Sequence, residues 1–131
     1  MAEKIAKRVD NHSSYVQQLA WLVWVHTDKI ATEENFEGAW QDLLDQNTPL
    51  FEKQTENLTM YQLNFLKAII DGVSKEFTTK NVLEKYNLGT SSSVAVVKRA
   101  LIKKELIDIE KKEIVISDIV LKEWLKREFK I

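Results

Sequence analysis

The stretch that decides the fold is residues 59–118, TMYQLNFLKAIIDGVSKEFTTKNVLEKYNLGTSSSVAVVKRALIKKELIDIEKKEIVISD. It opens on Thr59 and Gln62, which have the spacing of a capping box, in which each side chain binds the other residue's free backbone N–H. Apolar residues then recur at helical intervals over 63–73 and predict a buried helical face. A shorter helix is expected over about 79–86.

A tight turn, Asn87-Leu88-Gly89, leads to a third helix over about 90–104. Two β-branched segments follow, 106–109 and 113–116, and we expect them to pair as a hairpin. Asp118 is placed to cap a last helix. Helix, short helix, turn, helix, two-stranded ribbon and final helix is the order of a winged helix-turn-helix, so the sequence predicts this fold for its second part.

The first part of the chain is predicted to be a helical bundle, and the protein as a whole to be mainly α. Ser14 and Gln17 again have the capping-box spacing, and residues 15–25 are apolar nearly all round. Such a helix is expected in the middle of a bundle, or against a neighbouring domain if one of its faces is left exposed.

A third helix of this part is expected to begin after Thr32 and to end at Asn47-Thr48-Pro49, because proline removes a backbone donor. Residues 50–57 then form a short helix or a connector. These observations place one helical domain at 1–57 and the winged helix-turn-helix at 58–131.

Composition excludes several classes of function. The chain has no cysteine and only two histidines, His12 and His26, so neither a disulfide framework nor a zinc or other metal site is expected. No apolar run is long enough to span a membrane, and we expect a cytoplasmic protein. Residues 1–57 hold five basic and ten acidic residues (−5), whereas 58–131 hold fourteen and ten (+4). Opposite charges suggest different partners for the two parts.

No catalytic residues are expected. The three glycines are isolated, so there is no phosphate-binding loop. Ser13 and Ser14 lie beside His12 at a helix start, where a hydroxyl is far more often a cap than a nucleophile. The chain is therefore expected not to be an enzyme by itself.

The third helix of the winged part would present its outward face to a partner. Candidate nucleic-acid contacts on this helix and on the wing are Ser92, Lys98, Arg99, Lys103, Lys111 and Lys112. Val96 lies at the centre of the same face, and Glu110 and Glu113 flank the wing lysines, which favours protein contact instead. Candidate protein-contact residues are Trp21, Trp24 and Val96.

Two stretches carry a family resemblance. The run 11–20, NHSSYVQQLA, with Val23-Trp24 after it, resembles the opening of the helical lid in the STAND-type relatives of AAA+ ATPases, also called archaeal-type ATPases. The stretch from Leu58-Thr59-Met60 through 86–91, YNLGTS, to Trp124-Leu125 resembles the winged helix that closes such chains.

The resemblance implies that this is the non-catalytic C-terminal module of a longer ATPase. ATP and Mg²⁺ would be bound by an N-terminal nucleotide-binding domain, and no cofactor is expected in this chain. The lid of such proteins contributes a glycine-x-proline element next to the nucleotide. Asn11-His12-Ser13 stands at that position, with both the glycine and the proline replaced.

Three functions are carried forward from the sequence. In the first, the chain is the regulatory end of an ATP-dependent switch, and its winged helix contacts the parent domain, a partner protein or DNA. In the second, it is a free-standing transcriptional regulator that binds duplex DNA. In the third, the winged helix is a protein-interaction scaffold, with a homo-oligomer as one outcome. No membrane partner is expected.

Overall fold

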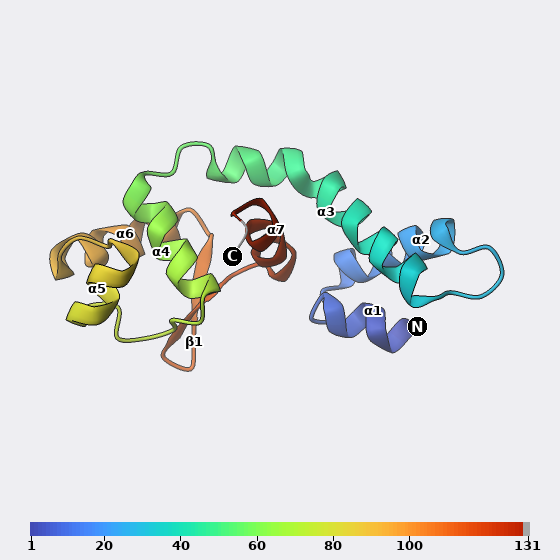
Figure 1. The fold of residues 1–131 in the computed structure, drawn as a ribbon, viewed down its shortest axis with the longest axis horizontal. Helices are drawn as coiled ribbons and strands as arrows, with labels where there is room; N and C mark the ends of the chain where they lie inside the picture. The colour runs from blue at the N-terminus through green and yellow to red at the C-terminus, as the bar shows by residue number, and fades with distance from the viewer. Residues whose placement is uncertain (130–131) are drawn as a thin grey trace. The chain divides into compact units, whose positions relative to one another are not determined.

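The computed structural model describes residues 1–129, which form seven α-helices and one two-stranded antiparallel hairpin before the last helix (Figure 1). The predicted fold class, mainly helical with a winged helix-turn-helix, is confirmed. The chain divides into two compact units, Met1–Phe51 and a second that begins at Glu52. The predicted domain boundary at 57/58 lies a few residues further along, in the turn after the third helix.

The first unit consists of α1 (Ala2–Arg8), α2 (Ser13–His26) and most of α3 (Glu33–Thr55). Each helix turns one apolar stripe inward. The buried side chains of the three stripes include Ile5, Tyr15, Leu19, Leu22, Val23, Phe36, Ala39, Trp40, Leu43 and Leu44.

Helix α1 is held to α3 by two cationic side chains. The guanidinium of Arg8 lies 4.8 Å from the ring centroid of Phe36 and 5.0 Å from that of Trp40, and it also donates to Glu37 Oε1 at 3.1 Å. Lys4 repeats the arrangement one turn earlier, over Phe36 and paired with Glu33. Cation–π contacts of this kind contribute about 0.5–1 kcal/mol each at partly exposed sites.

The predicted capping box at Ser14 and Gln17 is wrong. Helix α2 begins at Ser13, with His12 as a cap residue that makes no side-chain hydrogen bond. Ser14 therefore lies inside the first turn, where its Oγ accepts from Gln18 Nε2 at 3.2 Å. The start of α3 does follow the prediction, because Thr32 Oγ1 accepts from the Asn35 N–H at 3.1 Å and the Asn35 side chain returns a bond to the Thr32 N–H.

The predicted end of the third helix at 47–49 is also wrong, since α3 continues through Pro49 to Thr55. Two polar side chains before the proline bond back to the helix. Asn47 Nδ2 donates to the Leu43 carbonyl at 2.8 Å, and Thr48 Oγ1 donates to the Leu44 carbonyl at 2.9 Å. Back-bonds of this kind bend a helix locally, as an internal proline does, and the helix continues beyond them. Residues 50–55 are consequently helical and are not a connector.

The second unit contains α4 (Met60–Ile70), α5 (Lys80–Tyr86), α6 (Ser91–Lys103) and the wing strands β1 (Ile107–Glu110) and β2 (Glu113–Ile116). Helix α7 (Ile119–Phe129) follows. The strands pair in antiparallel register, with Ile107 opposite Ile116 and Glu110 opposite Glu113. The Ile114 N–H also donates to the Ser74 carbonyl at 2.8 Å, which ties β2 to the loop after α4.

Three helices of this unit begin with side-chain caps, two of which, at Thr59 and Asp118, the sequence predicts. Thr59 and Gln62 form the capping box of α4. Thr90 caps α6 with Ser93 as its reciprocal partner, and Asp118 Oδ1 accepts the backbone N–H groups of Val120 and Leu121 at the start of α7. A cap of this type is worth about 1 kcal/mol.

Gly89 sits in the turn that joins α5 to α6. Its φ of +81° is in the left-handed region, and a Cβ at this position would lie 2.5 Å from Ser93 Oγ. Glycine is therefore required here both by the backbone and by the close approach of the capping serine. The turn joins α5 to α6, and both helices contact α4.

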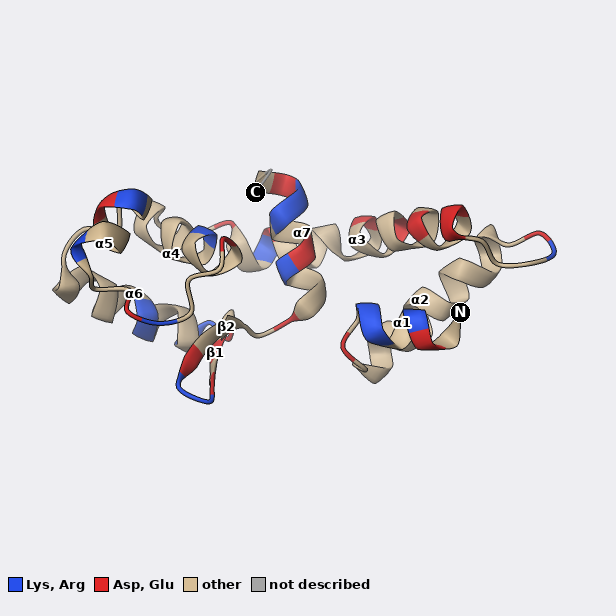
Figure 2. Ribbon diagram, turned by 60° about the horizontal axis from the view of Figure 1, so that its bottom comes forward, with Lys and Arg blue, Asp and Glu red and all other residues tan. Residues whose placement is uncertain are grey.

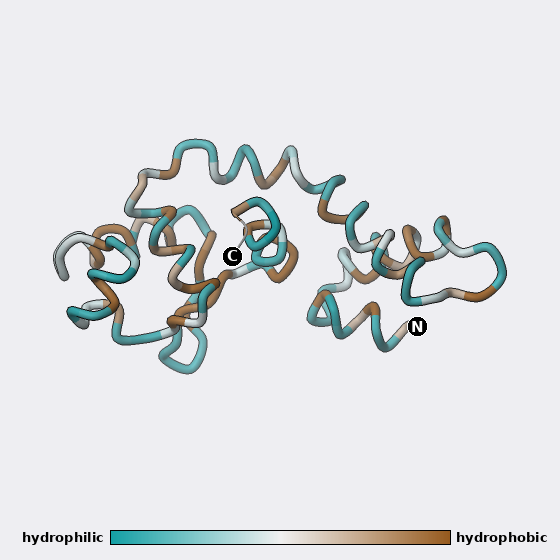
Figure 3. Tube along the Cα trace, in the orientation of Figure 1, coloured by the Kyte–Doolittle hydropathy of each residue, from teal (hydrophilic) through white to brown (hydrophobic). Residues whose placement is uncertain are grey.

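The wing is apolar at its base and polar at its tip, as the hydropathy colouring shows (Figure 3). Its base joins a core made by every element of the unit except α5. The buried apolar side chains of this core include Phe65, Leu66, Ile69, Phe77, Leu88, Val94, Val97, Leu101, Leu106, Ile107, Ile114, Ile116, Val120, Leu121, Trp124 and Leu125. Within residues 1–129, no helix combines the length and the apolar character needed to cross a bilayer.

Candidate functional site

Helix α6 presents a mixed face to solvent. Ser92, Val96, Arg99 and Lys103 are all exposed, on the side opposite the buried Val94, Val97 and Leu101. Val96 is 56% exposed at the centre of this face. A valine with that exposure offers apolar contact area, and it has no donor or acceptor with which to read a base edge.

The wing tip carries two lysines in a strained backbone. Lys111 and Lys112 have φ values of +50° and +66°, which are the two positive values that a type I′ hairpin turn requires. Asn-Gly is the usual sequence for such a turn, and a left-handed non-glycine residue costs roughly 1–2 kcal/mol. The turn geometry, which the sequence left uncertain, is thus achieved at some cost in stability.

Acidic residues offset these lysines. Glu110 and Glu113 stand directly opposite each other at the last pair of the ladder, one on each side of the turn. Figure 2 shows the blue lysine pair at the tip of the wing with red acidic residues on the strands beside it. The four residues sum to zero formal charge, so the tip is a polar surface and not a purely cationic one.

Lys98 differs from the other candidates because it is half-buried. It lines a pocket together with Lys75 from the loop after α4 and Lys112 from the wing. Lys75 is not among the residues predicted from the sequence, since a loop residue between two helices carries no periodic signal. Only the fold brings it to the same opening as α6 and the wing.

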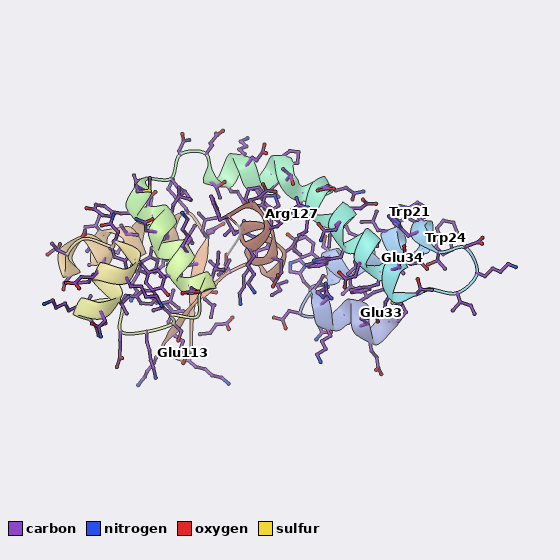
Figure 4. All side chains as sticks on the ribbon, viewed as in Figure 1. Trp21, Trp24, Glu33, Glu34, Glu113 and Arg127 are labelled. Atoms are coloured by element: carbon purple, nitrogen blue, oxygen red, sulfur yellow. The ribbon has the colours of Figure 1, made fainter. Side chains whose placement is uncertain are left out.

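Trp21 and Trp24 form the most exposed aromatic surface of the first unit. They are 61% and 68% exposed, and their rings stack with centroids 5.2 Å apart (Figure 4). Val25 and Ile30, close by in the chain, are 55% and 80% exposed. Helix α2 is therefore apolar on more than one face, as the sequence predicts. One of these faces is buried in the first unit, and the face that carries Trp21 and Trp24 is exposed.

Asn11 and His12 lie in the turn between α1 and α2, Ser13 is the first residue of α2, and all three are exposed. Asn11 has a φ of +58° and its N–H donates to the Ala6 carbonyl at 2.8 Å. The rings of His12 and Tyr15 contact each other, with their centroids 4.7 Å apart. These contacts are local, and the role that the family resemblance implies for the three residues remains a prediction.

Tyr86 is a titratable group whose pKa is shifted by its surroundings. The Tyr86 hydroxyl donates to the carboxylate of Asp71, and this hydrogen bond, with burial and the negative charge of Asp71 as smaller causes, raises the pKa of Tyr86 to about 12. The pair joins the end of α5 to the end of α4. Among the described residues, no three His, Cys, Asp or Glu side chains are grouped so that they could hold a metal ion.

The order α4, α5, turn, α6 and a two-stranded wing defines the second unit as a winged helix. Residues 49–127 match the family described as "Probable winged helix domain", and the chain belongs to this family. No curated protein and no solved structure matches the chain. Family membership establishes the fold, whereas function depends on the side chains that the fold presents.

Proposed function

We propose that the chain is a non-catalytic regulatory module of a longer ATP-dependent switch of the STAND/AAA+ type, and that its winged helix makes protein contacts. The observation that carries this proposal is the exposed Trp21–Trp24 pair on α2, the helix that resembles the lid of such ATPases. In the parent chain the nucleotide-binding domain, with its ATP and Mg²⁺, would be the neighbour that covers it.

Covering the exposed surface of Trp21 and Trp24 would stabilise a complex with a neighbouring domain. A tryptophan side chain buries about 150–250 Å² when it is covered, which at about 25 cal/mol per Å² is several kcal/mol for a pair. Two stacked and uncovered indoles therefore supply a large part of what a docking neighbour needs. Adjacent exposed apolar residues extend the same surface.

The winged helix is assigned to protein contact because of what α6 and the wing present together. The centre of the α6 face is Val96, and the wing tip has no net charge. Protein interfaces favour an apolar centre with a polar rim, whereas duplex binding depends on net positive charge against phosphates.

The test begins with the native gene product, detected in its own cells with an antibody raised to this chain. A product large enough to add a nucleotide-binding domain, with ATPase activity that co-purifies, is the expected result. Indole accessibility then probes the interface: acrylamide should quench Trp21 and Trp24 less in the native product than in the isolated chain. A native product of 15.3 kDa would overturn the proposal.

A second function, a DNA-binding regulator, is favoured by one specific observation. Arg99, Lys103 and the two wing lysines are exposed and have no ion pair among the described residues. The strained wing turn also suggests that lysines are kept there for contact and not for stability.

Duplex binding over a salt series tests this second function. Phosphate contacts predict a log–log slope near −0.9 per contact, so affinity should fall steeply as salt rises. Arg99→Ala should reduce sequence preference, and Lys111→Ala should weaken all sequences alike. Lys29→Ala, a charge change in the first unit, is the matched control and should have no effect. Absent or salt-insensitive binding would remove this function, and concentration-dependent self-association would favour the scaffold reading instead.

A further inference from the structure

A pocket of about 320 Å³ opens where α6, the loop after α4 and the wing meet. Four buried apolar side chains contribute to its lining, together with the hydroxyl residues Ser74, Thr78 and Ser91. Phe65, Phe77, Val94 and Ile114 are each less than 10% exposed, and the two phenylalanine rings stack with centroids 4.5 Å apart. The volume is at the lower end of the range for small-molecule sites, about 300–1,000 Å³.

Three lysines surround this opening, one from each element that forms it. Lys75 comes from the loop, Lys98 from α6 and Lys112 from the wing. None of them has an ion pair among the described residues, and Glu76 is the one acidic side chain in the lining. The lining residues thus hold three positive charges and one negative charge, and the acidic pair Glu110 and Glu113 lies beside Lys112 at the wing tip.

Lys98 is half-buried at this opening, whereas Lys112 is exposed. An anion in the pocket would supply the counter-ion that the Lys98 ammonium group lacks among the described residues. An apolar wall alone would suit many ligands, but the wall with its lysine rim selects one that is apolar at one end and negative at the other.

We propose that this pocket binds a small organic anion with a flat or branched apolar body, its carboxylate directed to the lysines and its body on the phenylalanine wall. This proposal does not depend on whether the contact partner of the winged helix is protein or DNA. A phosphate of a duplex could use the lysine rim, but it has no group to fill the apolar interior.

Occupancy of the pocket would act on the contact face. The ligand would touch Lys98 of α6 together with Ile109 and Lys112 of the wing, so it would join the two elements that present the face. It would also neutralise part of the positive charge there. Any partner that senses this charge or the position of the wing would bind with an affinity coupled to the ligand's, and the coupling would be reciprocal.

The experiment is a chemical-shift titration of the whole isotope-labelled chain with phenylacetate and, separately, with 2-phenylethylammonium, which has the same ring and the opposite charge. Phenylacetate should shift the amides of residues 74–78, 94–98 and 109–114 with a dissociation constant in the millimolar range, and the amine should not. Shifts that are absent, spread evenly over the surface lysines, or equal for the two probes would overturn the proposal.

Two variants sharpen the result. Lys98→Gln should weaken phenylacetate binding about fivefold, as expected for one partly exposed charge contact. Ala95→Phe introduces a ring at a lining position without changing charge, and it should abolish binding. Lys29→Gln is the control and should bind as the wild type does. The unshifted core amides of each variant report that it is folded. Unchanged binding in both pocket variants would contradict the assignment of the site.

Discussion

The ionisation of Tyr86 is coupled to the fold through its contact with Asp71. The hydrogen bond to Asp71 favours the protonated phenol and raises its pKa to about 12 from an ordinary value of 10.0. A raised pKa means that this group stabilises the folded state fully below pH 10 and that its contribution is lost as the pH rises toward 12. The free energy of unfolding should therefore fall over this window.

The measurement is the ultraviolet absorbance titration of tyrosinate, with Tyr86→Phe as the comparison. The difference between the two titration curves should show one phenol that ionises near pH 12. Tyr86→Phe should also make the free energy of unfolding less sensitive to pH between 10 and 12. A difference curve centred at pH 10 would contradict the hydrogen bond.

Tryptophan exposure gives a second prediction at the residue scale. Trp21 and Trp24 are mostly exposed, whereas Trp40 and Trp124 are 5% and 4% exposed. In the isolated chain, collisional quenching by iodide should therefore affect only part of the fluorescence. The double variant with phenylalanine at positions 21 and 24 should lose most of the quenchable part and keep its stability within about 0.5 kcal/mol, as surface substitutions usually do. Equal quenching in variant and wild type would show that the pair is covered.

At the scale of elements, we predict that a change of sequence in the wing turn can increase the stability of the second unit. Replacing Lys111-Lys112 with Asn-Gly supplies the residues that a type I′ turn prefers and should stabilise the second unit by about 1–2 kcal/mol. Thermal unfolding should then show a midpoint several degrees higher. The matched control replaces both lysines with alanine, which removes the same charges but keeps the backbone strain. If the control gained as much stability, charge and not backbone conformation would be the cause.

Helix α3 offers a further test, because it continues through an exposed proline. Pro49→Ala restores a backbone N–H within the helix and uses the residue with the highest helix propensity. We expect an increase in stability of about 1–3 kcal/mol, up to the difference between proline and alanine in a helix interior. Urea unfolding of the variant measures it, and a loss of stability would show that the proline is required.

At the scale of the whole molecule, the two units carry separate cores. A fragment that begins at Glu52 keeps every buried side chain of the winged helix and should fold by itself, with a single cooperative unfolding transition. A fragment that begins at Leu66 lacks half of α4 and is the control expected to be unfolded. Circular dichroism and amide dispersion distinguish them, and an unfolded first fragment would show that the units depend on each other.

The sequence by itself determined the winged helix. Its helices, caps and strands depend on residues only a few positions apart, such as Thr59 with Gln62 or Asp118 with the N–H groups after it. Two predictions from local sequence were wrong. Helix α3 continues through Pro49 although proline usually ends a helix, and Ser14 lies inside α2 and does not cap it.

Only the tertiary structure decided which side chains from distant elements lie close together and which remain exposed to solvent. Lys75, Lys98 and Lys112 come from three elements and share one opening because packing of the core brings those elements together. An apolar helix such as α2 does not reveal in its own sequence which face its neighbours will cover, so the exposure of Trp21 and Trp24 follows from the fold alone. Helix, cap and turn preferences depend on residues that are close in the sequence, whereas contacts between distant residues form only when the chain packs.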